Sequence, residues 1–175
     1  MINFKFNKEK AIAAILYITS QLKKNGYESD LHKVFKILYF ADRKHLATYA
    51  RPITGDDYIA MDNGPVPSSI YDILKYRTEK NLFQLVGFHI ESKQDPDIDE
   101  FSDSDTQFLD ESIEENKHLS FIDLTIKSHG AAWHKAVKNN TMDYCDIAEE
   151  EGASQDMCDF IELTAENERF ASSLN

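Results

Sequence analysis

The side chains of residues 31–41 follow the pattern of a buried helix. Ser29 and Asp30, just before this stretch, are typical of a helix start. The apolar side chains within it leave little surface for water: Leu31, Val34, Phe35, Ile37, Leu38, Tyr39, Phe40 and Ala41. A helix that is apolar around most of its circumference usually lies inside the fold. We therefore expect a central helix against which the others pack.

Five other segments have apolar side chains on one helical face only, which is typical of helices at the edge of a core. They begin near residues 7, 68, 104 and 120, and the last covers residues 157–164. Their expected core positions are Ala11, Ile15, Ile18, Leu22, Ile70, Ile73, Leu74, Phe108, Leu109, Ile113, Phe121, Leu124, Ile126, Met157, Phe160, Ile161 and Thr164. The expected caps are Asn7, Ser68 or Ser69, and two capping boxes, Ser104 with Gln107 and Ser120 with Asp123.

Three segments favour strands over helices. Residues 58–61, 82–90 and 98–101 are rich in side chains that favour β-structure, and Gly87 suggests a bulge in the second segment. We expect these segments to form one small antiparallel sheet. The predicted fold class is therefore α+β, predominantly α-helical, with the helices packed around a central buried helix. The length of 175 residues predicts a single domain, 1–175.

Asp42 interrupts the apolar pattern of the central helix, on the face that also carries His45. A buried carboxylate needs a partner, and His45 or Arg51 is the candidate. Two interpretations follow: a polar clamp that ties the helix end to the next turn, or the acid/base pair of a small hydrolase or nuclease that also uses Asp56 and Asp57. Nothing pairs a nucleophile with a base, so we favour the clamp and expect no enzymatic activity.

The charge of the chain is uneven along its length. The net charge is −12, and residues 91–175 carry only six basic against 22 acidic residues. Such an acidic half repels phosphate backbones and anionic lipid, so it argues against nucleic acid or membrane as a direct partner. It attracts a basic protein, or else it serves only to prevent aggregation. No apolar run approaches the roughly 18 residues of a membrane span.

Cys145 and Cys158 are the only cysteines, and they form no CxxC pair. This usage excludes a disulfide framework and an ordinary zinc site, and it favours a reducing, cytoplasmic setting. His129 and His134 are five residues apart, which does not place two imidazoles on one helical face. The lone Gly64 lacks the neighbours of a phosphate-binding loop. We therefore expect no metal and no cofactor.

A set of motif positions extends from the central helix into the turns that follow it. These positions are KILYFAD (36–42), HL (45–46), Tyr49, RPITGD (51–56), Tyr58, Ala60, GPVP (64–67) and Tyr71, with Leu124, His129 and Trp133 further on. The spacing resembles the signature of the Panacea domain, which is found in SocA-like antitoxins often carried by phages and mobile elements. The first set corresponds to the main motif of that family, and the second set to a weaker one.

The resemblance implies a protein that binds and neutralises a cognate toxin encoded beside it, in some members by escorting the toxin to a protease. It implies no known catalytic residue, and the toxins of the family are diverse. We expect a structural polar cluster of Asp42, His45, Arg51, Asp56, Tyr58, Gly64, Pro65 and Pro67. The candidates for binding a toxin with a basic surface are Trp133, Asp156, Asp159, Glu162 and Glu166.

Overall fold

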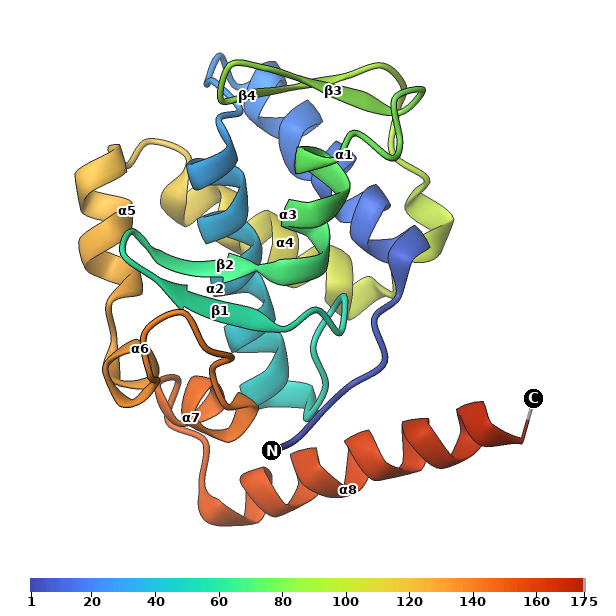
Figure 1. The fold of residues 1–175 in the computed structure, drawn as a ribbon, viewed down its shortest axis with the longest axis vertical. Helices are drawn as coiled ribbons and strands as arrows, with labels where there is room; N and C mark the ends of the chain where they lie inside the picture. The colour runs from blue at the N-terminus through green and yellow to red at the C-terminus, as the bar shows by residue number, and fades with distance from the viewer. Residues whose placement is uncertain (175) are drawn as a thin grey trace.

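The structure is a computed structural model that describes residues 1–174. Its helices are α1 (Lys8–Lys24), α2 (Leu31–Tyr49), α3 (Ser68–Lys75), η1 (Ile98–Glu100), α4 (Asp103–Asn116), α5 (Phe121–Ser128), α6 (Ala131–Lys135), α7 (Tyr144–Glu149) and α8 (Gln155–Ser173). Its strands are β1 (Tyr58–Met61), β2 (Gly64–Pro67), β3 (Phe83–Val86) and β4 (His89–Ser92). The predicted class, α+β and predominantly helical, is confirmed (Figure 1).

The helix α2 is the centre of the fold, as the sequence predicts. Asp30 caps its start by accepting a hydrogen bond from the backbone N–H of Lys33 at 2.9 Å. Ala50, at φ 58°, turns the chain out of the helix at the other end. One core cluster packs α2 against α1, α3 and α4, and a second packs it against β1, α5 and α7. Because α2 belongs to both clusters, it holds the two halves of the molecule together.

The strands form two separate hairpins, so the expectation of one sheet over 58–61, 82–90 and 98–101 is wrong. β1 pairs with β2, and β3 pairs with β4, both antiparallel. Each hairpin closes through a two-residue connection, so each strand meets its neighbour in sequence first. Gly87 lies in the second connection at φ 62° and forms no bulge, and residues 98–100 form the short helix η1.

Two of the four predicted caps in the other helices are confirmed. Asn7 caps α1, and Ser120 with Asp123 forms the capping box of α5. The capping box of α4, however, pairs Ser102 with Asp105, because Ser104 already lies within the helix. Ser68 and Ser69 do not cap α3, which begins at Ser68 after Pro67.

The inner face of α5 differs from the one expected, and that of α8 differs at one position. In α5 only Leu124 of the three predicted apolar positions is buried, while Phe121 and Ile126 are exposed. In α8 the expected positions Met157, Ile161 and Thr164 are buried or partly buried, and Phe160 is exposed. Both helices cover the core from outside, and α8 extends beyond the body of the molecule (Figure 1). A helix in that position buries one narrow face, which apolar spacing alone does not identify.

Candidate functional site

The carboxylate of Asp42 ties α2 to the chain that follows it. One of its oxygens accepts a hydrogen bond from the backbone N–H of Ile53 at 2.5 Å, and the other accepts one from the Tyr58 hydroxyl at 2.6 Å. Burial raises the pKa of Asp42 to about 6, although both hydrogen bonds work in the opposite direction. The prediction that His45 or Arg51 is the partner of Asp42 is therefore wrong. The helix end is instead bound to the turn and to β1.

His45 and Arg51 meet around a different carboxylate, that of Asp105. Its side chain lies 2.8 Å from Lys10 Nζ, 3.0 Å from Arg51 Nη1 and 3.2 Å from His45 Nε2. Burial works to raise the pKa of Asp105, but the hydrogen bonds from His45, Lys10 and the Ser102 backbone, with the charge of Arg51, hold it well below its usual range. Asp105 thus joins α4 to α1 and α2.

Asp105 was not among the residues singled out from the sequence. It lies in an acidic stretch, where a carboxylate is normally exposed to solvent. The available signal was its place three residues after Ser102, which suits a capping box. The contacts with α1 and α2 come from residues 54 to 95 positions away in the chain. Sequence spacing does not report contacts of that range.

Asp56 performs the capping that α3 lacks from its own serines. Its two carboxylate oxygens accept the backbone N–H groups of Ser69 at 2.9 Å and Ile70 at 2.8 Å. Burial raises the pKa of Asp56, and these two backbone hydrogen bonds oppose the rise. The Tyr144 hydroxyl donates to the backbone carbonyl of Asp56 at 2.8 Å, which adds α7 to the same junction.

The Gly64–Pro67 strand lies over a buried lysine. Lys36 is 1 % exposed, and its Nζ donates to the Pro65 carbonyl at 2.8 Å. Burial lowers the pKa of Lys36 to about 7. Gly64 has φ 97°, and a Cβ there would overlap with the Ser128 hydroxyl, so only glycine fits. Lys36 was not predicted from the sequence as a buried polar residue. A lysine within an otherwise apolar helix is a signal that could have indicated it.

The hydrogen bonds of Asp42 and His45 are made to other groups of the fold and not to each other. Asp42 is 2 % exposed and His45 is fully buried. His45 Nδ1 donates to the Arg51 carbonyl at 2.8 Å, and its Nε2 lies 3.0 Å from the Ser104 hydroxyl. The oxygens of Asp42 are directed to Ile53 and Tyr58. The hydrogen-bonding groups of both side chains are therefore used within the fold.

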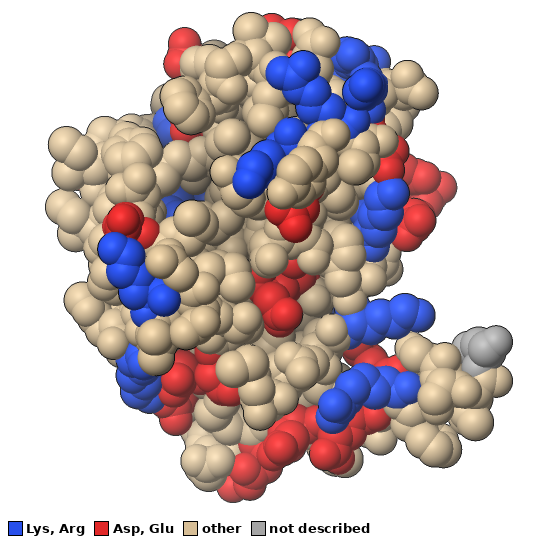
Figure 2. All heavy atoms as spheres, viewed as in Figure 1, with Lys and Arg blue, Asp and Glu red and all other residues tan. Residues whose placement is uncertain are grey.

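The predicted partner-binding residues fall in two places. Trp133 is half-buried, donates its indole N–H to the Met61 carbonyl at 2.9 Å and stacks on His129. It therefore supports β1. The four acidic residues lie exposed on α8: Asp156, Asp159, Glu162 and Glu166. Figure 2 shows acidic side chains gathered along this helix at the bottom of the view.

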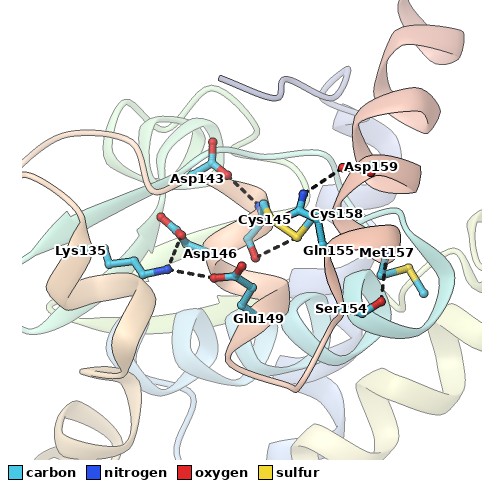
Figure 3. Close-up of a disulfide and its surroundings, with 10 residues drawn as sticks. All are labelled: Lys135, Asp143, Cys145, Asp146, Glu149, Ser154, Gln155, Met157, Cys158 and Asp159. Carbon is cyan, nitrogen blue, oxygen red and sulfur yellow. Dashed lines mark hydrogen bonds and ion pairs between the residues drawn. A yellow bond between two sulfur atoms is a disulfide. The ribbon is translucent and has the colours of Figure 1, made fainter.

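A disulfide between Cys145 and Cys158 joins α7 to α8, with the two Cα atoms 5.2 Å apart (Figure 3). The sequence was expected to carry no disulfide framework, and the structure has this single bond between its two cysteines. They are 13 positions apart in sequence, and the turn between α7 and α8 brings them together. Glu149 lies close enough to be a third metal ligand, but the two sulfur atoms are bonded to each other.

The helix α8 also borders a cavity of about 510 Å³. Glu168 and Ser172 of α8 line one side, and Lys10, Arg51 and Pro52 belong to the opposite side. Burial raises the pKa of Glu168, while Arg51 and Lys10 lower it. Asp42 and His45 do not line this cavity. Among residues 1–174, no helix combines the length and the apolar run that a bilayer span requires.

Comparison with known proteins agrees with the motif spacing. A family model described as "Antitoxin SocA-like, Panacea domain" matches residues 34–134, from within α2 to within α6. No curated protein and no solved structure matches the chain. The matched range includes Asp42, Asp105 and the Gly64–Pro67 strand, which are the junctions described above. The match covers more than half of the chain, which therefore belongs to the family of SocA-like antitoxins with a Panacea domain.

Proposed function

We propose that this protein neutralises a cognate protein toxin by direct contact. The observation that carries the proposal is the family match over residues 34–134. The contacts of Asp42, His45 and Asp56 add support, since these side chains are engaged in holding the fold together. A protein that acts by binding needs no reaction centre, and we assign it no catalytic residue.

The toxin is expected to present a basic surface. The exposed acids of α8 include Asp159, Glu162 and Glu166 on a chain whose net charge is −12. Complementary charge mainly raises the rate of association, and added salt screens it. The rate of association with the toxin should therefore fall as the salt concentration rises.

Co-expression with the product of the adjacent gene tests the proposal. If that product is the toxin, this chain should restore growth, and the two proteins should co-purify in about equal amounts. Unrelieved toxicity with no complex would refute it. An adaptor that delivers the toxin to a protease would also restore growth. It would do so by shortening the lifetime of the toxin, which a pulse–chase measurement reports.

We assign the protein to the cytoplasm together with the toxin. The Cys145–Cys158 disulfide weighs against this setting, because cytosolic thiols are usually kept reduced. Labelling of free thiols in freshly lysed cells decides the point. A cytoplasmic chain should react at both cysteines, and an exported one at neither.

A further inference from the structure

The helix α8 has two apolar faces, and only one of them is covered. Cys158, Ile161 and Ala165 point into the second core cluster or the disulfide. Three large apolar side chains lie on the opposite face, Phe160, Leu163 and Phe170, and Leu174 follows directly after the helix. These four side chains are between 50 and 71 % exposed. Large exposed apolar side chains that form one stripe usually mark a contact surface.

The spacing of the stripe is that of a helix–helix seam. Phe160, Leu163, Asn167, Phe170 and Leu174 are separated alternately by three and four residues. This repeat keeps one face of a helix directed at a second helix over its whole length. Asn167, which is exposed, takes the middle position. A polar residue at such a position in a seam fixes the alignment of the two helices.

One edge of the stripe is acidic. Asp159 and Glu166 directly precede Phe160 and Asn167 of the stripe. Both are exposed. In a two-helix seam these flanking positions choose the partner through charge. They therefore favour a helix with lysine or arginine along its facing edge.

We propose that the outer face of α8 binds an amphipathic, basic helix of the protein partner, with apolar residues at heptad spacing against the stripe. The identity of that partner as the toxin rests on the function proposed above. The prediction that the partner is a basic, amphipathic helix does not rest on that function, because it follows from the exposure, spacing and charge of the side chains on α8.

A second copy of this chain fits the surface less well. Each copy carries a net charge of −12, so association of two copies brings like charges together. An anionic membrane is disfavoured for the same reason. A basic helix instead gains the apolar contact and lowers the net charge of the complex.

The test uses a synthetic three-heptad peptide with leucine at the seam positions and lysine at the flanking ones. Two control peptides keep its length: one has glutamate in place of lysine, and one has the same composition without the repeat. The lysine peptide should bind the full-length protein, and the two controls should bind at least about tenfold more weakly. Equal binding of the scrambled peptide would reveal simple charge attraction and overturn the proposal.

A double variant, Phe160→Ser with Phe170→Ser, tests whether the peptide binds at the stripe of α8. It should weaken binding of the lysine peptide by at least about tenfold, because the largest apolar contacts are lost. The matched control is Ile122→Ser with Ile126→Ser on α5, where the side chains are 68 and 67 % exposed. That control should bind within about twofold of the wild type. Circular dichroism should show both variants folded, since all four positions face solvent.

Two further outcomes separate this proposal from the proposed function. If the wild type neutralises the toxin and the Phe160/Phe170 variant does so equally well, the antitoxin function stands and the α8 surface is refuted. If the wild type fails to neutralise while the peptide binds as described, the surface stands and the function is refuted. A wild-type dimer in sedimentation that the variant loses, without peptide binding, would assign the surface to a second copy and overturn the proposal.

Discussion

The helices α2 and α8 are both 19 residues long, yet they differ in almost every other respect. Eleven residues of α2 are buried, including Lys36, Asp42 and His45, against three in α8. The polar side chains Lys36, Asp42 and His45 of α2 are hydrogen-bonded within the fold. Those of α8 are mostly exposed beside an apolar stripe. One helix holds the molecule together, and the other displays side chains to its surroundings.

The family match divides the chain in the same way. It covers residues 34–134 and so includes most of α2 but neither α7 nor α8. Antitoxins with different toxins could share a common core and bind their partners through a separate helix. The surface of α8 proposed above therefore lies outside the matched range.

Truncation of one leucine in each helix gives the largest expected contrast. Leu38→Ala in α2 should lower the free energy of unfolding by about 2–5 kcal/mol, because Leu38 is fully buried and leaves a cavity. Leu163→Ala in α8 should change it by less than about 0.5 kcal/mol, because half of that side chain is already exposed. Urea denaturation measures both. Similar losses at the two sites would contradict the division.

Loss of the disulfide should release α8 while leaving α2 intact. Cys158→Ser opens a loop of about 14 residues, and its closure accounts for up to about 3 kcal/mol. Hydrogen exchange should become faster in α8 and stay slow in α2. The control is Cys145→Ser, which should have the same effect, and the double variant should add little because either change removes the same bond. An equal loss of protection in α2 would show that the two regions unfold together.

The pH dependence of stability should report Asp42. Its folded pKa of about 6 exceeds the ordinary value of 3.8, so the folded state binds more protons between these values. This carboxyl should therefore stabilise the fold by about 2 kcal/mol as the pH falls from 7 to 4. Asp42→Asn should lack this contribution.

The comparison of wild type and variant cancels the other titrating groups. Asp105 in particular acts with the opposite sign, because its pKa is lowered and its contribution to stability is lost as the pH falls. Parallel stability curves for wild type and Asp42→Asn between pH 4 and 7 would show that the Asp42 carboxyl is not desolvated as described.

The smallest effect on stability is expected for the acids of α8. Asp159→Asn with Glu166→Gln should shift the free energy of unfolding by less than about 0.5 kcal/mol. The rate of association with the toxin should fall, and it should depend less on salt. Stopped-flow mixing measures the rate. Asp95→Asn with Asp99→Asn, exposed acids around η1, should leave it unchanged, and an equal fall there would mean that only total charge matters.

The sequence predicted α2 well because burial on all sides leaves a strong local pattern. The start at Asp30, the apolar circumference and the turn after Tyr49 are all properties of neighbouring residues. Asp42 was recognised as a buried carboxylate for the same reason. Its partners were not, because Ile53 and Tyr58 are 11 and 16 residues away and reach it only through the turn.

The predominantly helical α+β class, the central helix and the family motifs could be predicted from the sequence, since each depends on spacing within a short segment. The packing of the chain was needed to show which carboxylate His45 and Arg51 meet, that Cys145 bonds Cys158, and which face of α8 remains uncovered. These features depend on how distant segments approach one another. Periodicity shows that a helix has an apolar face, but the packing of the whole chain determines whether that face is covered.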